Sequence, residues 1–262
     1  AVAITGQCSM ALEKEYISRK REEEAAMARA EQLRSNLLRS ISHDLRTPLT
    51  SISGNAGVLM SDGESLAAEH RNRIYRDIYD DSMWLINLVE NLLSITRMEG
   101  QGVHLHMETE LLEEVIDEAM RHINRRHEHH TIKVKQEGDY ILADMDARLI
   151  IQVITNLVDN AVKYTPEGSV ITVNSRQEGG SAVIDVSDNG PGIPDESKEK
   201  IFEMFYTTGH KSADGKRGMG LGLPLCRAIL SAHKGTIEVL DNKPAGSIFR
   251  LILPAKEVSL HE

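Results

Sequence analysis

His43 is followed directly by a carboxylate, Asp44, and has a hydroxyl side chain, Thr47, at the i+4 position. The apolar residues around it recur at spacings of three and four, which predicts an amphipathic helix with one buried stripe. The stripe consists of Leu38, Ile41, Leu45, Leu49, Ile52, Ala56 and Leu59. At about 100° per residue, His43 points away from the apolar stripe. Thr47 lies one turn above His43, on the same face of the helix. The imidazole is therefore presented outward, although a solvated surface histidine would show the same pattern.

A second polar pattern lies on the helix expected over residues 146–164. Its core face is apolar, and a separate stripe carries uncharged amides and one lysine at spacings of four, four and three. This stripe consists of Gln152, Asn156, Asn160 and Lys163. An amide oxygen can be a neutral Mg²⁺ ligand, and a lysine can meet phosphate charge. The row indicates a metal and phosphate site, and a merely polar helix surface is the alternative.

The segment Asp188-Asn-Gly-Pro-Gly-Ile-Pro194 ends a predicted strand. Gly190 and Gly192 would let the backbone approach a ligand closely, and the Asp188 carboxylate can accept a hydrogen bond from an adenine amino group. A simple turn would also fit this segment.

Further glycines, at Gly218, Gly220 and Gly222, precede a predicted helix. Free backbone donors at a helix N-terminus make an anion site, although a single glycine motif is weak evidence. The polar stretch Tyr206–Arg217 between the two glycine segments suits a lid that closes over a nucleotide.

The bulk composition excludes several classes of protein. A formal charge of −10 over 262 residues argues against a general nucleic-acid binder. The sequence has no apolar run of membrane-spanning length and no secretory signal pattern. Its two cysteines, Cys8 and Cys226, have no metal-type spacing, which suits a reducing cytoplasm. Because the chain opens without methionine, we expect it to be part of a larger protein.

The elements that must position these residues fall into two groups. The first is helical: one long helix over about 10–61, which Pro48 should kink, a turn at Ser61–Ser65, and a second helix over about 66–98. Two antiparallel helices cannot bury such wide apolar stripes against each other, so we expect two chains to form a four-helix bundle. The glycines of Glu99–Gly102 mark a domain boundary.

The second group is mixed. Helices are expected at about 110–125, 146–164 and 220–233, and strands at about 103–108, 131–136, 140–143, 169–176, 181–188, 235–241 and 246–253. An antiparallel hairpin should turn at Glu178-Gly-Gly180. This clustering predicts a two-layer α/β sandwich and not a doubly wound parallel sheet.

Five motifs occur in a recognisable order. They are Ser42-His-Asp-Leu-Arg-Thr-Pro-Leu-Thr50, Asn156-Leu-Val-Asp-Asn-Ala-Val-Lys-Tyr164, Asp188-Asn-Gly-Pro-Gly192, Ile201-Phe-Glu-Met-Phe205 and Gly218-Met-Gly-Leu-Gly222. They resemble the H, N, G1, F and G2 boxes of bacterial two-component sensor histidine kinases, and the likeness runs over about 33–254. Glu31–Asp44 also resembles the potassium-responsive members of that family.

The resemblance implies a domain plan: a signalling helix over 1–32, a dimerisation and phosphotransfer domain over 33–99, and a catalytic ATP-binding domain over 103–256. The last would have the sandwich fold of the Hsp90, gyrase and histidine-kinase type. The parent protein would be anchored in the cytoplasmic membrane upstream of this region, with the region itself facing the cytoplasm.

The resemblance also implies a phosphorelay. His43 would attack the γ-phosphorus of ATP, with Asp44 orienting the ring and accepting its proton. The phosphohistidine would then pass its phosphoryl group to an aspartate in the receiver domain of a response regulator. Thr47 matches the position that orients water for the reverse, phosphatase reaction.

For the nucleotide, the resemblance implies that Asn160 binds Mg²⁺, with Asn156 one turn earlier near the metal and phosphates. The other contacts implied are Lys163 to phosphate, Tyr164 near the nucleotide, Asp188 to the adenine amino group, Gly190 and Gly192 beside the base, and Gly218, Gly220 and Gly222 around the phosphates. Phe202 and Phe205 would anchor the lid, and Lys211, Lys216 and Arg217 are candidate γ-phosphate contacts.

Two other functions stay open at this point. A degenerate scaffold would dimerise and bind a regulator without catalysis. A superfamily ATPase would hydrolyse ATP, but such enzymes usually carry glutamate at the position of Asn156, and asparagine cannot act as that base. A metal site at His127, His129 and His130 is a lesser alternative, because the spacing matches no common zinc site.

Overall fold

The computed structural model describes residues 19–20, 45–63, 65–99, 105–123, 129–138, 140–207 and 220–256. Several predicted site residues lie outside these ranges, namely His43, Asp44, Gly218, the three lid cations Lys211, Lys216 and Arg217, and His127. The chain divides into two compact units, Ala1–Asn87 and Leu88–Glu262. Each unit is described by itself.

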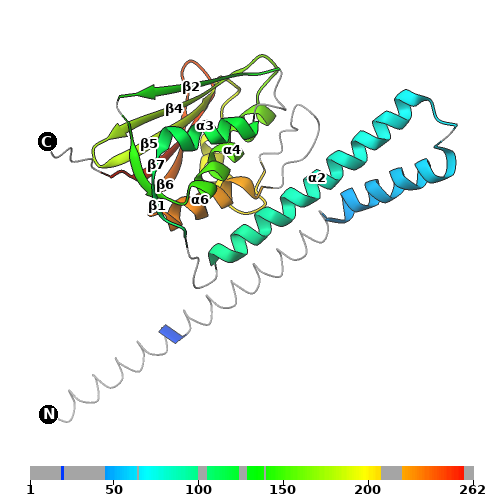
Figure 1. Cartoon of the computed structure of the whole chain (residues 1–262), viewed down its shortest axis with the longest axis horizontal. Helices are drawn as coiled ribbons and strands as arrows, with labels where there is room; N and C mark the ends of the chain where they lie inside the picture. The colour runs from blue at the N-terminus through cyan, green and yellow to red at the C-terminus, as the bar shows by residue number, and fades with distance from the viewer. Residues whose placement is uncertain are drawn as a thin grey trace, which may run out of the picture. The chain divides into compact units, whose positions relative to one another are not determined.

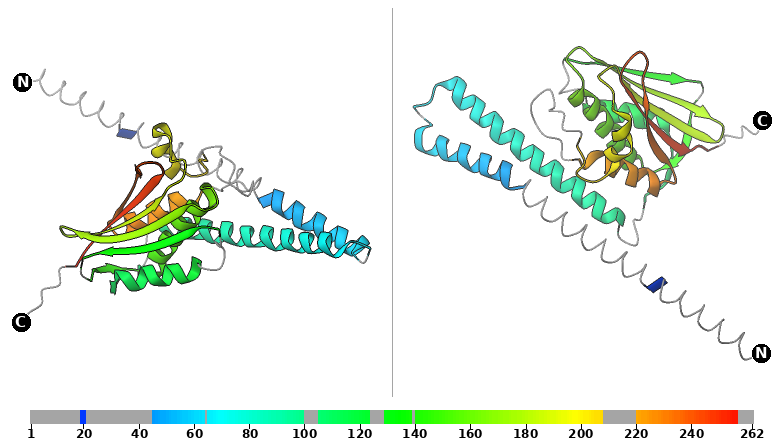
Figure 2. Two further views of the ribbon diagram at one scale, coloured as in Figure 1. Left: turned by 90° about the horizontal axis from the view of Figure 1, so that it is seen from above. Right: turned by 180° about the vertical axis from the view of Figure 1, so that it is seen from behind.

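The first unit is a helical hairpin. One helix covers residues 45–62 and ends where the Gly63 N–H donates to the Leu59 carbonyl at 3.2 Å. A turn follows, in which the Ser65 N–H donates to the Asp62 carbonyl at 2.9 Å. The second helix, α2 (Ala68–Glu99), confirms the helix predicted over 66–98. Within the unit the two helices run antiparallel, side by side (Figures 1 and 2). Most of the long helix predicted upstream lies outside the described residues, and the helix is described only from Leu45, three residues before Pro48.

The hairpin leaves much apolar surface uncovered. Ile74 of α2 is buried, yet six large apolar side chains of the unit are exposed: Leu49, Val58, Met60, Tyr75, Tyr79 and Ile86. An antiparallel pair of helices can bury only the stripes that face each other, so a second apolar face remains on each helix. None of the helices that the structure describes is long and apolar enough to span a membrane.

The second unit contains a sheet with helices on one face. Its strands are β1 (Glu108–Leu111), β2 (Thr131–Glu137), β3 (Leu142–Met145), β4 (Val170–Glu178), β5 (Ser181–Asp188), β6 (Thr236–Asp241) and β7 (Ser247–Pro254). Its helices are α3 (Leu112–Ile123), α4 (Ala147–Tyr164), α5 (Asp195–Lys198), the 3₁₀ helix η1 (Lys200–Phe202) and α6 (Gly222–Ala232).

The main sheet has the strand order β2-β4-β5-β7-β6, and β1 pairs with β3 in a small separate sheet. Only the β2–β4 pair is parallel. Helices α3, α4 and α6 cover one face of the main sheet (Figures 1 and 2). This two-layer sandwich confirms the predicted fold class, and the β4–β5 pairing confirms the hairpin predicted at residues 178–180.

One predicted strand is wrong. The segment expected as a strand at 103–108 is irregular at residues 105–107, and the first strand begins at Glu108. Its register is set by pairing with β3, in which Glu108 lies opposite Met145 and Leu111 opposite Leu142. The pattern of apolar residues within one segment cannot predict a pairing with a strand so distant in sequence. The short elements α5 and η1 were not predicted either, because one or two turns leave no periodic signal.

Candidate nucleotide-binding site

Helix α4 separates its apolar and polar side chains cleanly. Its buried residues are Ile150, Val153, Ile154, Leu157, Val158 and Ala161, which share the face that packs into the core. The predicted polar row of Gln152, Asn156, Asn160 and Lys163 lies off this face and is half-buried. The Lys163 ammonium stands 5.4 Å from the ring centroid of Tyr164, at the end of the helix. Packing of one face thus holds a line of amides at the edge of the core.

Asn156 has an unusual environment for an amide. Its Nδ2 atom is buried and has no hydrogen-bond partner of regular geometry among the described residues. Its neighbour is the thiol of Cys226 on α6, whose pKa is raised to about 12 by burial, with a smaller opposing effect of the Asn156 amide. A thiol is a weak hydrogen-bond acceptor, so the Asn156 amide is poorly satisfied by the protein groups around it.

The start of α6 lies against the same polar row. A Cβ added to Gly222, the first residue of α6, would come within 3.9 Å of the Asn160 amide nitrogen. Asn160 therefore faces the N-terminus of a helix whose free backbone N–H groups suit an anion. The amide row and the N-terminus of α6 therefore lie beside each other.

Gly220 lies two residues before the start of α6. Its φ of 62° lies in the left-handed region, and a Cβ there would lie 2.7 Å from the Cα of Phe205. The Phe205 N–H donates to the Gly220 carbonyl at 2.8 Å, which holds the two ends of the intervening segment together. Phe202 is buried beneath the Arg227 guanidinium, 4.2 Å from its ring centroid. The Phe202 side chain and the Phe205 backbone thus both contact other parts of the protein.

Asp188 ends β5 as a buried carboxylate. Its Oδ1 atom accepts hydrogen bonds from the Gly190 N–H at 2.8 Å and the Ser247 N–H at 3.3 Å. Burial raises the pKa of Asp188 above its ordinary value, and these two backbone hydrogen bonds oppose that shift. Both bonds fall on one oxygen, so Oδ2 is left to receive a donor from a ligand.

The glycines beside Asp188 are required by close packing. A Cβ on Gly190 would lie 2.5 Å from the Thr165 methyl carbon. Gly192 has a φ of 77°, and its Cβ would lie 3.3 Å from the Gly246 carbonyl oxygen. Three chain segments therefore meet at the end of β5 with no room for side chains, which explains the glycines at these positions.

Sequence reasoning missed some members of this site. Thr165, Gly246 and Ser247 all contact the Asp188 segment but were not singled out. Gly246 and Ser247 were taken only as the start of a strand, since their contact with Asp188 spans 59 residues. A glycine and a small polar residue at the start of the last strand were the only signal, and by themselves they indicate no more than a tight turn.

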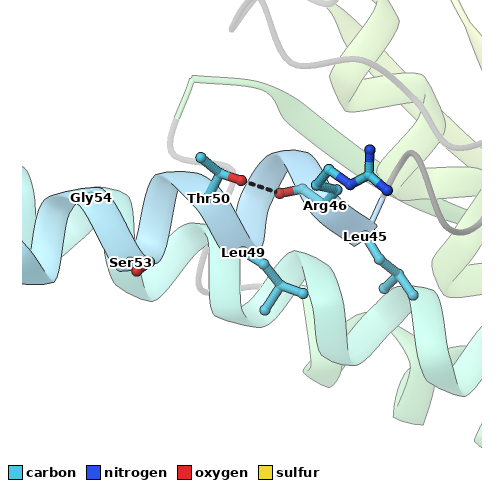
Figure 3. A pocket seen from close by; sticks show the side chains of 6 residues that line it. All are labelled: Leu45, Arg46, Leu49, Thr50, Ser53 and Gly54. Atoms are coloured by element: carbon cyan, nitrogen blue, oxygen red, sulfur yellow. Dashed lines mark hydrogen bonds between the residues drawn. The ribbon is translucent and has the colours of Figure 1, made fainter.

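In the hairpin, Thr47 is exposed and Pro48 is buried. A shallow groove follows them along the helix over residues 45–62, and it is lined by Leu45, Arg46, Leu49, Thr50, Ser53 and Gly54 (Figure 3). The Leu45 and Leu49 side chains point to one side of this helix, while Arg46 and Thr50 point to another. The Thr50 hydroxyl donates to the Arg46 carbonyl at 2.8 Å. The groove combines apolar and polar side chains within two turns of Thr47.

Two protein-family models match this chain. Residues 33–101 match the His Kinase A (phospho-acceptor) domain, and residues 145–257 match the family of histidine kinase-, DNA gyrase B- and HSP90-like ATPases. The chain belongs to the sensor histidine kinases, and this confirms the family that the five motifs predicted.

Individual relatives narrow this to a KdpD-like subgroup. The chain is 41% identical over 251 residues to the sensor protein KdpD of Clostridium acetobutylicum, covering 96% of this chain and 28% of that protein. It is 37% identical over 234 residues to KdpD of Escherichia coli, covering 89% of this chain and 26% of that protein. The chain thus spans little more than a quarter of these relatives.

A solved structure is similar in fold to this chain. The histidine kinase ThkA, in complex with the response regulator protein TrrA, superposes with a TM-score of 0.64 at 27% identity. The match covers 84% of this chain and 61% of that chain.

Proposed function

We propose that this chain is the catalytic part of a sensor kinase that phosphorylates its own His43 with ATP and then phosphorylates an aspartate of a response regulator. The observation that carries the proposal is that α4 links the predicted segments: Gly222 lies beside Asn160, and Gly190, two residues after Asp188, packs on Thr165 at the end of α4. Family membership supports the use of ATP by this site.

The site would recognise ATP at both ends. Asp188 would accept a hydrogen bond from the adenine amino group through its Oδ2 atom, and the backbone of Gly190 and Gly192 would lie beside the base. At the other end the free N–H groups at the start of α6 would face the phosphates, and Lys163 would add a positive charge. The missing acceptor for Asn156 Nδ2 would then come from the bound nucleotide or its water.

The amide row also suits Mg²⁺. Asn160 offers a neutral hard oxygen ligand beside the α6 terminus, and Mg²⁺ usually takes few protein ligands and completes its shell with phosphate and water. When bound, Mg²⁺ would neutralise phosphate charge during transfer. No group of three His, Cys, Asp or Glu side chains gathers as a metal site in the described part of the chain.

His43 would be the nucleophile of the transfer. One ring nitrogen forms a bond to the γ-phosphorus as the bond from that phosphorus to the bridging oxygen of ADP breaks. The proton on the other ring nitrogen passes to Asp44. Water competes poorly because Asn156, unlike a glutamate, cannot deprotonate it. The phosphoryl group is therefore kept for the histidine.

The partner would be a receiver domain docked near His43. The structure of ThkA with TrrA supports a response regulator as partner. The groove in the hairpin begins at Leu45, two residues after His43 in sequence, and offers both apolar and polar contacts to such a domain. Thr47 would orient a water molecule for removal of the phosphoryl group from the regulator, giving a phosphatase activity.

A homodimer and a membrane-anchored parent protein complete the proposal. The exposed apolar face of the hairpin would be covered by a second copy, which makes a four-helix bundle. Upstream regions of the parent protein would hold this part at the cytoplasmic side of a membrane.

Incubation of the chain with γ-labelled ATP and Mg²⁺ tests the proposal. We expect an acid-labile, base-stable phosphate that maps to His43 by mass spectrometry under non-acidic conditions. The His43→Gln variant should bind ATP normally and take up no label. Steady release of inorganic phosphate by that variant would instead identify an ATPase, and no labelling of the unaltered chain would indicate a scaffold.

A further inference from the structure

The turn between β6 and β7 lies directly against Asp188. Gly246 approaches so closely that a Cβ there would lie 2.0 Å from the Asp188 carbonyl oxygen. The same turn supplies the Ser247 N–H that donates to Asp188 Oδ1. Contacts to both the backbone and the side chain of Asp188 therefore come from one turn far along the chain.

Asn242 makes the shortest of the hydrogen bonds from this turn to Asp188. Its Nδ2 atom donates to the Asp188 carbonyl at 2.6 Å, and its Oδ1 atom accepts from the Lys243 N–H at 2.9 Å. The two contacts fix which way the amide points, since only its nitrogen can donate to a carbonyl. The turn itself is closed by the Asn242 N–H, which donates to the Gly246 carbonyl at 3.0 Å.

We infer that Asn242 is a positioning residue for recognition of the adenine base. It does not reach the ligand site through its own side chain but holds the backbone of Asp188, while Ser247 and Gly190 hold Oδ1 of the carboxylate. Oδ2 is thereby fixed in one direction before any nucleotide binds, and preorganisation of this kind improves both affinity and specificity. The inference rests on the proposed function, in which Asp188 accepts from the 6-amino group of adenine.

A positioning role of Asn242 can be distinguished from a general structural role by measuring how strongly the chain prefers a nucleotide that carries the 6-amino group. The probes are ATP and purine riboside 5′-triphosphate, which lacks that amino group but keeps the rest of the nucleotide. The measurement is the dissociation constant of each with Mg²⁺ for the full 262-residue chain, by calorimetry. The ratio of the two constants reports the contact with Asp188 alone.

Asn242→Asp is the variant that tests the hydrogen bond to the Asp188 carbonyl most directly. It keeps the shape of the side chain and the acceptor for Lys243, but it replaces the donor to the Asp188 carbonyl with an oxygen. We expect ATP to bind about three- to tenfold more weakly, the usual effect of one lost hydrogen bond, with the analogue changing by less than about twofold. Asn242→Ala should act in the same direction. Equal weakening of both nucleotides, or no change in either, would overturn the inference.

Two further variants complete the design. Asn174→Ala is the matched control: this amide donates to Glu137 at 2.9 Å and makes no contact with Asp188, so the ratio should stay at its original value. Asp188→Asn should bring the ratio close to one. If it does not, the adenine assignment of the proposed function is wrong and this inference goes with it. If it does, while both Asn242 variants keep the original ratio, only the inference fails.

Discussion

The two units differ most in how completely they bury their own apolar side chains. In the sandwich, Leu157, Ile184 and Leu225 are fully buried between α4, the sheet and α6. In the hairpin, Tyr79 remains 59% exposed and Ile86 49% exposed. A core that is complete within one chain can hold a binding site by itself, whereas a helix pair with uncovered apolar faces needs another protein surface. In the proposed function, the sandwich would therefore bind the nucleotide and the hairpin would carry assembly and phosphotransfer.

Gly220→Ala should have the largest effect and should act on only one unit. The added Cβ would require a left-handed φ and would collide with the Phe205 backbone, so we expect His43 labelling to fall about a hundredfold or more. The oligomeric state should not change. Gly180→Ala is the control, because no atom lies within 4 Å of its added Cβ and its φ is ordinary. Normal labelling of Gly220→Ala would count against the phosphate role of this segment.

Leu157→Ala tests whether the sandwich folds independently. Removal of this fully buried side chain should lower the free energy of unfolding of that unit by about 2–5 kcal/mol. Urea titration followed by circular dichroism should show an early transition for the sandwich, with the hairpin transition unmoved. A shift of both transitions together would mean that the two units unfold as one.

Ile86→Asp tests whether a second copy of the chain covers the exposed apolar face of the hairpin. In an isolated hairpin a half-exposed side chain could be replaced at little cost. If a second copy covers it, the two equivalent sites together lose about 3–6 kcal/mol, and the dissociation constant of the dimer should rise by a factor of at least about a hundred. Sedimentation velocity measures this. Tyr140→Asp, at a side chain of the sandwich that is 73% exposed, should leave the oligomeric state unchanged.

The smallest effects should come from two aspartates of β5 that respond oppositely to pH. Burial would raise the pKa of Asp185, but hydrogen bonds from Arg250 and Arg176 outweigh it and lower the pKa, whereas the pKa of Asp188 is raised by burial. A lowered folded-state pKa gives stability that is present above the unfolded pKa and lost as pH falls through the folded value. Asp185→Asn should therefore destabilise the sandwich by about 1–3 kcal/mol at neutral pH and by much less in acid.

For Asp188 the sign is reversed. A raised folded-state pKa gives stability only below that pKa, and it is lost as pH rises through the folded value. Asp188→Asn should consequently be at least as stable as the unaltered chain at neutral pH, although it binds ATP poorly. Urea unfolding over a range of pH, without nucleotide, measures both variants. A loss of stability at neutral pH in Asp188→Asn would contradict this assignment.

Much of the fold could be predicted because its signals are local. The three-and-four spacing along α4, the alternation along β5 and the glycine pair between β4 and β5 each depend on neighbouring residues only. The predicted strand at 103–108 failed for the opposite reason, since β1 is defined by its pairing with β3 and not by its own periodicity. His43 and Asp44 lie outside the described residues, so their roles stay predictions.

The sequence by itself determined which side chains could do chemistry: an outward imidazole, a row of amides, a carboxylate and glycines near a helix start. Their residue types and spacing carry that information because periodicity places them on common faces. Only the tertiary structure decided that the β6–β7 turn supports Asp188, that Cys226 lies against Asn156 and that Gly190 packs on Thr165. Such contacts join residues far apart in the chain, and they follow from close packing of segments that carry no local pattern.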